Sequence, residues 1–421
     1  MGQRIQLTKI TNVPIPKYSN LGSREYRLAI DDITKDILEH WQSHPFDFTE
    51  FAEQLKRQRA PFSFRLATKI AHSYSLVQNI TQKVMVSVIF PVYNEKNRLH
   101  TSKSHPHGEN LLRTKIGQLE NLSTHNKNLS WQMTIVDDGS DDGTGHIINF
   151  ILEKEYPEYL KSGQVKVLFI SDAIKQKYSY LEEVKSLSHS GKGSSITYGL
   201  DLRNKEYKPN KDEEHILIYT DADLSVHLGQ IGIAINKILS KDCDAVIGQR
   251  RLKDSLIIRP KIKTARGKLY IYLLNKLIPD FVDFVIDPQA PLKAITSTAF
   301  KKISTHIREP GFAFDVEFLL LLKIMNIKTC PLGIAFVDST KESHTKGSSV
   351  HLEILKRIIK IRKRQQPRSP ADSALEKFIS KLNTDQWDKL TQNVPEEIKK
   401  STSKRLGKLS IPLKEFTAIA S

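Results

Sequence analysis

The feature that most constrains the fold of this chain is a short run of strand-forming residues that ends abruptly in carboxylates. Ile216 to Tyr219 is apolar, and Asp221 and Asp223 follow within Thr-Asp-Ala-Asp-Leu-Ser. Residues two apart on an extended backbone project from the same side, so both carboxylates can converge on one ligand. Ligands bind at the carboxyl ends of strands in open α/β sheets, and two hard oxygen donors there suit Mg²⁺ or Mn²⁺. A turn followed by a helix N-cap explains the same tripeptide, so both interpretations stay open on this motif alone.

The same arrangement, an apolar strand followed by polar residues, recurs along the middle of the chain. Val84 to Phe90 is a nearly continuous apolar run, typical of a strand buried on both faces of a parallel sheet. Further strands are expected at 131–136, 165–170 and 245–248, and helices at 111–122, 144–155, 191–202 and 228–239. Strands that alternate with helices predict an α/β fold with a doubly wound, mostly parallel sheet.

Helical segments are expected on both sides of this α/β region. Before it, helical periodicity covers 26–40, 48–57 and 62–78. We therefore predict a helical N-terminal extension at 1–80, a catalytic domain at 81–345 and a basic helical tail at 346–421. In the second half of the catalytic domain we expect helices at 264–278 and 314–325, two short strands within 284–295, and strand sequence at 328–337.

The chain is strongly basic. Its formal net charge is +17 over 421 residues, which calls for an anionic partner such as nucleic acid, an acidic membrane surface or a phosphorylated substrate. No apolar run is long enough to span a bilayer, and the N-terminus lacks the apolar core of a signal peptide. These features predict a cytoplasmic protein whose membrane contact, if any, is peripheral.

Four polar clusters are expected to meet at one edge of the sheet, because parallel strands bring their carboxyl ends together. The clusters are Pro91–Glu95, Asp137–Thr144, Gly191–Ser195 and Asp221–Ser225. Lys192 adds a cation near the start of a helix, where anions bind. The Gly-Lys-Gly segment is not a Walker A loop, since Ser186 and Gly193 stand where that motif requires Gly and Ser or Thr. The combination predicts a nucleotide diphosphate that is bound through a metal ion.

Taken together, these motifs resemble a known family. Phe-Pro-Val-Tyr-Asn-Glu, Val-Asp-Asp-Gly-Ser-Asp-Asp-Gly-Thr, Gly-Lys-Gly-Ser-Ser and Thr-Asp-Ala-Asp-Leu-Ser are similar, in that order, to motifs of family-2 inverting glycosyltransferases of the glycosyltransferase-A fold. Val-Ile-Gly-Gln-Arg-Arg, Asp-Pro-Gln-Ala-Pro-Leu-Lys and Gly-Phe-Ala-Phe-Asp-Val-Glu resemble the branch that contains dolichyl-phosphate glucose and mannose synthases. The resemblance covers residues 84–343. It implies transfer of a sugar from a UDP- or GDP-linked donor to a polyprenyl phosphate at a membrane surface.

The resemblance also implies roles for individual residues. Those that would line the nucleotide pocket, with Asp137 reading the base, are Pro91, Tyr93, Glu95, Asp137 and Asp138. Those that would contact phosphate are Lys192 and either Arg250 or Arg251, and those that would bind Mg²⁺ or Mn²⁺ are Asp221 and Asp223. Those that would lie on the sugar and acceptor side are Asp287, Gln289, Asp315 and Glu317. The catalytic side chains would be Asp223, Asp287 and Asp315.

This sequence departs from the family pattern at two places. Ala290-Pro291-Leu292 replaces the Cys-Gly-Phe common in this branch, and the loop after Glu95 is longer than usual. A glycosyltransferase with a hydroxyl acceptor on a glycan, small molecule or protein therefore stays open. So does a basic scaffold that binds a membrane or nucleic acid through a degenerate domain, although the intact carboxylates argue against it.

Two basic amphipathic helices are expected in the second half of the chain, and each would either lie on a membrane or pack on the catalytic domain. The apolar residues of the first are Leu269, Leu273, Leu274, Leu277 and Ile278, and those of the second are Leu352, Leu355, Ile358 and Ile359. Such helices lie on anionic membranes, but packing on the catalytic domain explains the same stripes. The cations that crowd one connection near the expected site are Arg250, Arg251, Lys253, Arg259, Lys261 and Lys263. They would dock an anionic acceptor or form a solvated loop.

Overall fold

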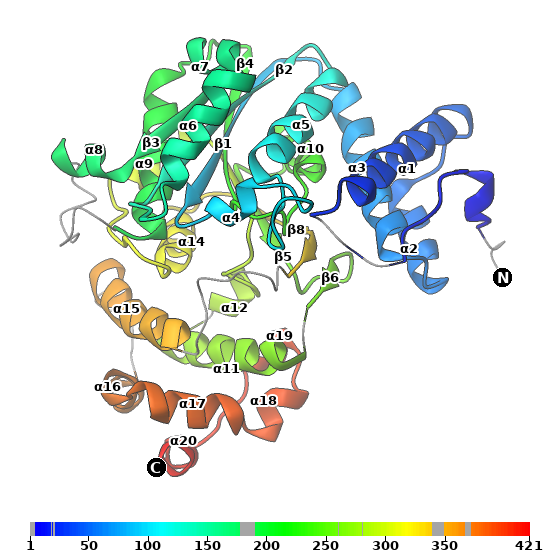
Figure 1. Cartoon of the computed structure of the whole chain (residues 1–421). Coiled ribbons are helices and arrows are strands. Elements are labelled where there is room, and N and C mark those ends of the chain that lie inside the picture. Colours follow the sequence, from blue (N-terminus) through cyan, green and yellow to red (C-terminus); the bar gives the residue numbers. More distant parts are fainter. Residues whose placement is uncertain are drawn as a thin grey trace.

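A seven-stranded sheet forms the centre of the molecule (Figure 1). The computed structural model describes residues 5–17, 19, 22–176, 190–259, 261–279, 281–338, 349–366 and 372–421. The strand order is β3-β2-β1-β4-β7-β5-β8. The strands are β1 (Lys83–Val92), β2 (Leu129–Asp137), β3 (Val165–Phe169), β4 (Glu213–Tyr219), β5 (Ala245–Gln249), β7 (Lys293–Thr296) and β8 (Thr329–Gly333). Neighbouring strands are parallel except that β7 runs antiparallel to β4 and β5. The predicted α/β fold with a mostly parallel sheet is confirmed.

Strand β1 shows why these segments are strands. Val84, Val86 and Val88 are buried on one face of the sheet and Ile89 on the other. β-Branched side chains pack well on a pleated surface, and full burial of each contributes about 1.5–3 kcal/mol. The register pairs Ile89 with Tyr219 and Val92 with Asp137. The carboxyl ends of β1, β2 and β4 therefore lie at one edge.

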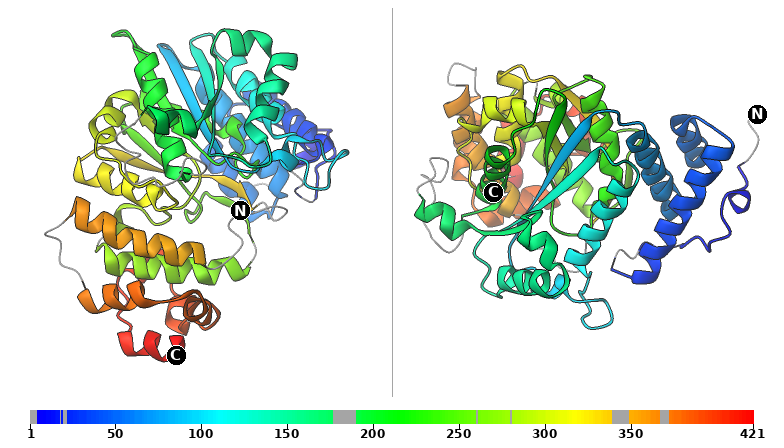
Figure 2. Two further views of the ribbon diagram at one scale, coloured as in Figure 1. Left: turned by 60° about the vertical axis from the view of Figure 1, so that its left-hand side comes forward. Right: turned by 90° about the horizontal axis from the view of Figure 1, so that it is seen from above.

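Helices cover both faces of the sheet (Figure 2). Those on one face are α5 (Leu111–Thr124), α6 (Thr144–Glu155) and α10 (Gly232–Leu239). Those on the other are α9 (Lys192–Glu206), α13 (Ser297–Ser304) and α14 (Phe314–Ile324). The stretch predicted as a helix at 228–239 begins with a 3₁₀ turn, η3 (Leu228–Ile231), before α10. Short helices fill several connections: α4 (Lys96–Leu99), α7 (Pro157–Lys161) and α8 (Ile170–Lys175).

The N-terminal extension is helical, as expected, and packs on the α10 side of the sheet. A short 3₁₀ turn, η1 (Leu7–Lys9), precedes α1 (Arg24–Ser43), α2 (Phe48–Arg57) and α3 (Phe62–Gln78). A Cβ on Gly232 would come within 2.5 Å of the Ser73 hydroxyl, so α3 and α10 approach closely. Ile33, Leu55 and Phe64 are fully buried in the same core as β1. Packing of the extension against the α/β region thus stabilises both.

The C-terminal helices pack together with α11 (Lys261–Leu277) in a helical layer beside the sheet (Figure 1). They are α15 (Ser349–Gln365), α16 (Ser373–Lys381), α17 (Thr384–Gln392), α18 (Glu396–Lys400), α19 (Ser403–Leu406) and α20 (Leu413–Ala420). Leu274, Leu355 and Ile358 have no exposed surface, and the other apolar residues of both amphipathic stripes are buried too. The membrane interpretation of these stripes is therefore wrong, because each helix covers the apolar face of the other.

One strand prediction needs correction, and the strand sequence predicted at 328–337 is confirmed. The structure describes all of 284–295 and has one strand there, β7, because residues 281–284 form a helical turn, α12 (Phe281–Phe284). The segment 328–337 forms two strands, β8 and then β9 (Ala335–Val337), which leaves the main sheet and pairs with β6 (Leu256–Ile258). Among the described helices, none combines the length and apolar character needed to cross a bilayer.

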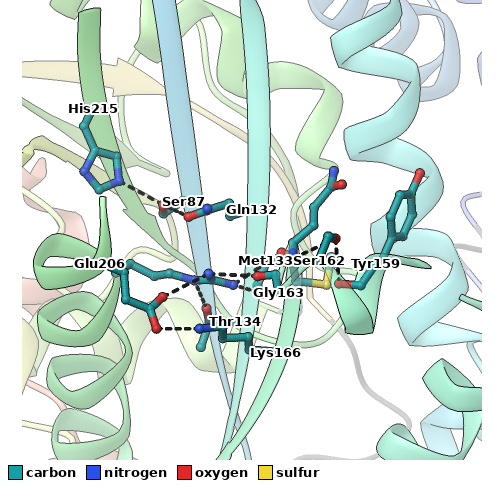
Figure 3. A network of polar contacts seen from close by, with 12 residues as sticks. Ser87, Gln132, Met133, Thr134, Tyr159, Ser162, Gly163, Lys166, Glu206 and His215 are labelled. Atoms are coloured by element: carbon teal, nitrogen blue, oxygen red, sulfur yellow. Dashed lines mark hydrogen bonds and ion pairs between the residues drawn. The ribbon is translucent and has the colours of Figure 1, made fainter. Parts of the chain in front are cut away.

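A buried polar network crosses the α9 face of the sheet (Figure 3). Arg203 of α9 donates to the Thr134 hydroxyl at 2.6 Å and to the carbonyls of Met133 and Gly163 at 2.9 and 3.0 Å. Beside it, the His215 ring lies 2.9 Å from the Ser87 hydroxyl. Buried polar groups are stable only when hydrogen-bonded, so this network fixes the position of α9 on β1, β2 and β4.

Candidate active site

The polar residues that follow β1 and β2 are joined directly. The backbone N–H of Asn94 donates to the Ser140 hydroxyl at 2.9 Å, and that of Glu95 donates to the Thr144 hydroxyl at 2.8 Å. Pro91 and Tyr93 are half-buried beside these contacts, whereas Glu95 is buried. The two predicted clusters therefore form one surface at the edge of the sheet.

Asp137 and Asp138 hold backbone loops in place. Asp137 is 3% exposed and accepts hydrogen bonds from the N–H groups of Gly139, Ser140 and Gly145 at 2.6–2.9 Å. Asp138, equally buried, accepts from the N–H groups of Ser190 and Gly191. The second set ties the end of β2 to the Gly-Lys-Gly segment. Contact of Asp137 with a base stays a prediction.

The glycines beside Lys192 allow a close approach between two chain segments. Gly191 has a φ of +102°, and a Cβ there would lie 2.5 Å from the Pro310 carbonyl oxygen. A Cβ on Gly193 would lie 2.4 Å from the Glu309 carbonyl oxygen. Only glycine leaves room for this contact. The start of α9 is thereby fixed against the loop that precedes α14, with Lys192 as its first residue.

Lys192 brings two predicted site carboxylates together. Its Nζ lies 2.7 Å from Asp221 Oδ1 and 3.7 Å from Asp315 Oδ2. Lys293, the first residue of β7, also pairs with Asp315, which in addition accepts a hydrogen bond from the Tyr219 hydroxyl at 2.9 Å. Asp315 and Lys293 are almost completely buried, whereas the Asp221 side chain is 37% exposed. The result is a row of alternating charges that runs from the interior to the sheet edge.

The pKa shifts in this row follow from burial and charge. Burial alone would lower the pKa of Lys192, but Asp221 and Asp315 raise it above its usual value. Burial would raise the pKa of Asp221, yet Lys192 lowers it. Burial, assisted by Asp315, raises the pKa of Tyr219 well above its usual range. Lys192 is therefore a cation, Asp221 an anion and Tyr219 a neutral donor at neutral pH.

The second carboxylate of the Asp-x-Asp element has separate partners. Asp223 Oδ1 accepts from the Ser225 N–H at 3.1 Å, and its Oδ2 lies 3.6 Å from Arg98 Nη1. Arg98 is 4% exposed and also lies 3.3 Å from Glu95. Sequence reasoning missed Arg98 and Lys293, because neither lies in a cluster at the carboxyl end of a predicted strand. Arg98 follows Glu95 by three residues on α4, which was the available signal.

On the other side of β4, Arg250 and Asp287 form a forked ion pair. Arg250 Nε and Nη2 donate to the two oxygens of Asp287 at 2.8 and 2.9 Å, and Nη2 also reaches the Gln289 carbonyl at 2.9 Å. Burial would raise the pKa of Asp287, but Arg250 lowers it well below its usual range. Such bidentate pairs are strong and fix geometry. Burial lowers the pKa of the neighbouring Arg251, with Asp287 acting in the opposite direction.

No family model matches the chain, but several known proteins are similar to it in sequence. The dolichyl-phosphate β-glucosyltransferase of Trichomonas vaginalis is 25% identical over 259 residues, 60% of this chain and 65% of that protein. The enzyme of the same name from Dictyostelium discoideum is 24% identical over 301 residues, 68% of this chain and 77% of that protein. This chain is similar in sequence to dolichyl-phosphate glucosyltransferases over 60–68% of its length. The resemblance to family-2 glycosyltransferases is thereby confirmed.

A solved structure also aligns with the chain. It is the glucosyl-3-phosphoglycerate synthase from Mycobacterium tuberculosis in complex with Mn²⁺, UDP and glucosyl-3-phosphoglycerate, at 13% identity and a TM-score of 0.44. The alignment covers 72% of this chain and 85% of that chain.

Glu317 of α14 lies in the interior and is held by several hydrogen bonds. It has no exposed surface and accepts from the backbone N–H groups of Arg308 and Glu309 at 2.8 and 2.6 Å. It also accepts from Arg364 and Gln365 at the end of α15. These contacts attach the C-terminal helices to α14. A role for Glu317 on the sugar and acceptor side stays a prediction.

The donor atoms of Asp221 and Asp223 fit a divalent metal ion. Carboxylate oxygens on partly exposed side chains are what Mg²⁺ and Mn²⁺ prefer, and Mg²⁺ is commonly bound by one or two carboxylates together with substrate phosphates. Among the described residues, no group of three or more His, Cys, Asp and Glu side chains is arranged to hold a metal ion without such help.

Proposed function

We propose that this chain is an inverting glycosyltransferase that transfers a sugar from a UDP- or GDP-linked donor to a polyprenyl phosphate. Two relatives are dolichyl-phosphate β-glucosyltransferases, which supports this acceptor class. One observation carries the proposal: the carboxylates of Asp221, Asp287 and Asp315 are each held by a lysine or an arginine. The consequences of this charge pairing differ for the donor and for the acceptor.

The donor diphosphate would bind at the carboxyl end of β4. Asp221 and Asp223 would hold Mg²⁺ or Mn²⁺ there, which when bound stabilises the negative charge that develops on the leaving diphosphate. Lys192 at the start of α9 and Arg250 would contact the phosphate oxygens. Tyr93, half-buried directly after β1, would line the nucleoside end.

The pairing of the acids favours a phosphate acceptor over a hydroxyl acceptor. A general base works best when its pKa is near the operating pH, but Arg250 and Lys192 lower the pKa values of Asp287 and Asp221. A phosphate is already anionic at neutral pH and requires cations rather than a base. An oxygen of that phosphate would attack the anomeric carbon while the bond from that carbon to the diphosphate breaks, which inverts the configuration.

Arg251 and Arg259 are the cations that would dock the acceptor phosphate. Arg259 lies 3.3 Å from Asp338, and burial lowers its pKa, with Arg250 acting in the same direction. Phe312 is 38% exposed beside Gln289, whose side-chain amide donates to the Phe312 carbonyl at 3.4 Å. An exposed aromatic ring close to the phosphate site would meet the prenyl chain. The reaction would then take place where the protein touches the cytoplasmic face of a membrane.

A donor screen with and without acceptor tests this function. UDP-glucose, other UDP-sugars and GDP-mannose are incubated with the protein and a short-chain polyprenyl phosphate, and glycolipid and free nucleotide are measured. We expect sugar transfer with one donor. The transfer rate should fall at least about a hundredfold in Asp223→Asn or in excess EDTA, because a metal ion stabilises the transition state by several kcal/mol and each 1.4 kcal/mol changes the rate about tenfold. The exposed Asp242→Asn is the matched control.

The outcomes separate the possible functions. Transfer to a sugar or protein hydroxyl, with none to polyprenyl phosphate, would replace the proposed acceptor with the alternative one. Wild-type rates in Asp223→Asn would remove the metal from the reaction. Failure of every nucleotide sugar to bind would leave the protein without this enzymatic function.

A further inference from the structure

Lys192 pairs with Asp221 Oδ1, an oxygen atom that would otherwise be available to a metal ion. Its Nζ is 2.7 Å from Asp221 Oδ1, and the lysine side chain is only 19% exposed. The α9 backbone that carries this lysine is fixed by the Gly191 and Gly193 contacts with the loop before α14. The ammonium group is therefore placed on the carboxylate by the fold, unlike a surface lysine that moves freely.

Lys192 and a metal ion cannot both bind the Asp221 carboxylate tightly. Like charges within a few ångströms repel strongly where water is partly excluded, so Lys192 and a divalent ion compete for Asp221. Lys192 also has a second anionic neighbour, Asp315 Oδ2 at 3.7 Å, whose other oxygen is already neutralised by Lys293. The Lys192 ammonium group can thus move away from Asp221 if another anion replaces Asp221 as its partner.

A donor diphosphate is such an anion. We propose that Lys192 is an internal counter-cation, whose ammonium group pairs with the Asp221 carboxylate in the donor-free protein and thereby excludes a divalent metal ion. When the donor binds, the ammonium group moves to the diphosphate, and the Asp221 carboxylate becomes available to the metal ion. This inference rests on the proposed function, because it takes a nucleotide diphosphate as the ligand. Metal and nucleotide then bind cooperatively, and by thermodynamic linkage each raises the affinity for the other by the same factor.

Binding of Mn²⁺ to the full-length protein tests the exchange without any turnover. Free Mn²⁺ is followed by electron paramagnetic resonance in Lys192→Met, in Lys192→Arg and in wild type, with no nucleotide and with saturating UDP or GDP. We expect Lys192→Met, which lacks the charge, to bind Mn²⁺ alone at least about tenfold more tightly than wild type, about 1.4 kcal/mol. Lys192→Arg keeps the charge and should bind Mn²⁺ as weakly as wild type.

A matched control lies on the same helix. Lys205 forms an ion pair with Asp201 at 2.6 Å on α9 but is 60% exposed, so Lys205→Met should leave Mn²⁺ binding unchanged. In wild type, saturating nucleotide should raise Mn²⁺ affinity at least about tenfold, and in Lys192→Met this enhancement should fall below about threefold.

Each outcome decides the matter. Equal Mn²⁺ affinity in Lys192→Met and wild type, or no Mn²⁺ binding to either, overturns the proposal. If Lys192→Met does not fold, the wild type still tests it, since Mn²⁺ that binds equally tightly with and without nucleotide overturns it. Tighter Mn²⁺ binding in Lys192→Met without any binding of UDP or GDP would support the lysine–metal competition and refute the transferase function.

Discussion

Asp287 offers the most direct test of charge pairing at a single residue. Asp287→Asn keeps the side-chain shape but removes the charge that holds the Arg250 fork. We expect a loss of about 2–3 kcal/mol in the free energy of unfolding, somewhat below the cost of about 3–5 kcal/mol for breaking a fully buried pair. Transfer should fall at least about tenfold, because Arg250 loses its fixed position. Urea unfolding and kcat/KM measure the two effects.

The control for this change is an exposed ion pair. Asp172 is 51% exposed and lies 3.8 Å from Lys175, which is 72% exposed, so Asp172→Asn should change the free energy of unfolding by less than about 1 kcal/mol. If Asp287→Asn behaves like Asp172→Asn in both measurements, the Arg250 fork has no importance for either stability or activity.

At this scale the sequence indicated the acidic residues better than their partners. Asp221 and Asp223 stand out as polar residues at the end of an apolar run, whereas Asp287 is singled out only through the family resemblance. Lys293 could not be identified, since its burial depends on β7 running antiparallel beside β4, a pairing between residues about 75 positions apart that periodicity does not reveal. Arg98 looked like one more cation in a basic loop, yet it is buried next to Asp223.

At the scale of elements, the network that joins α9 to the sheet should respond to pH (Figure 3). Burial, and then the charge of Arg203, lowers the pKa of His215 to about 4. The unfolded chain binds this proton near the ordinary pKa of about 6.5, so the free energy of unfolding falls as pH decreases through that window. Through His215, the free energy of unfolding should be about 2 kcal/mol lower at pH 5 than at pH 7.

His215→Gln removes this titration while it keeps a polar group near Ser87. The difference between the free energies of unfolding at pH 7 and pH 5 should therefore be about 2 kcal/mol smaller in His215→Gln than in wild type. His146→Gln, at an exposed position on α6, is the control and should keep the wild-type difference. Identical pH dependence in His215→Gln and wild type would show that His215 does not carry the effect.

Helices were predicted more accurately than strands because their signal is local. The predicted bounds of the second and third helices, 48–57 and 62–78, coincide with α2 and α3. Residues 284–286 were taken for a strand because Phe-Val-Ile is typical of one, but residue 284 ends a helical turn and the chain then leads into the Arg250–Asp287 pair. Tertiary contacts overrode β-propensity there.

At the scale of the whole molecule, the C-terminal helices are part of the folded unit. Removal of residues 349–421 would expose the apolar face of α11, including Leu269, Leu273 and Leu274, which are now at most 1% exposed. Loss of this burial costs about 1.5–3 kcal/mol for each side chain, so several side chains together cost an amount comparable to the whole free energy of unfolding of a typical domain, about 5–15 kcal/mol. We expect the shortened protein to be insoluble or to lack a cooperative thermal transition by circular dichroism.

The paired variant Lys360→Gln and Lys363→Gln provides the control, because both lysines are exposed on α15. It should unfold like wild type. A deletion protein that is soluble and melts cooperatively would show that the tail is a separate unit. The sequence could not distinguish membrane contact from packing, because an amphipathic stripe is the same whichever apolar surface covers it.

The antiparallel strand β7 has a consequence for the order in which the molecule is assembled. β5 pairs with β7 and β8, both of which follow it in the chain, whereas β1 pairs with β2 and β4, and only β7 connects β5 to β4. During synthesis, β5 therefore waits for residues 293–296 to leave the ribosome before it can join the sheet. The same strand begins with Lys293, which neutralises Asp315. β7 thus both connects β5 to the rest of the sheet and supplies a charge that balances Asp315, and a nascent chain that stops before residue 293 has neither.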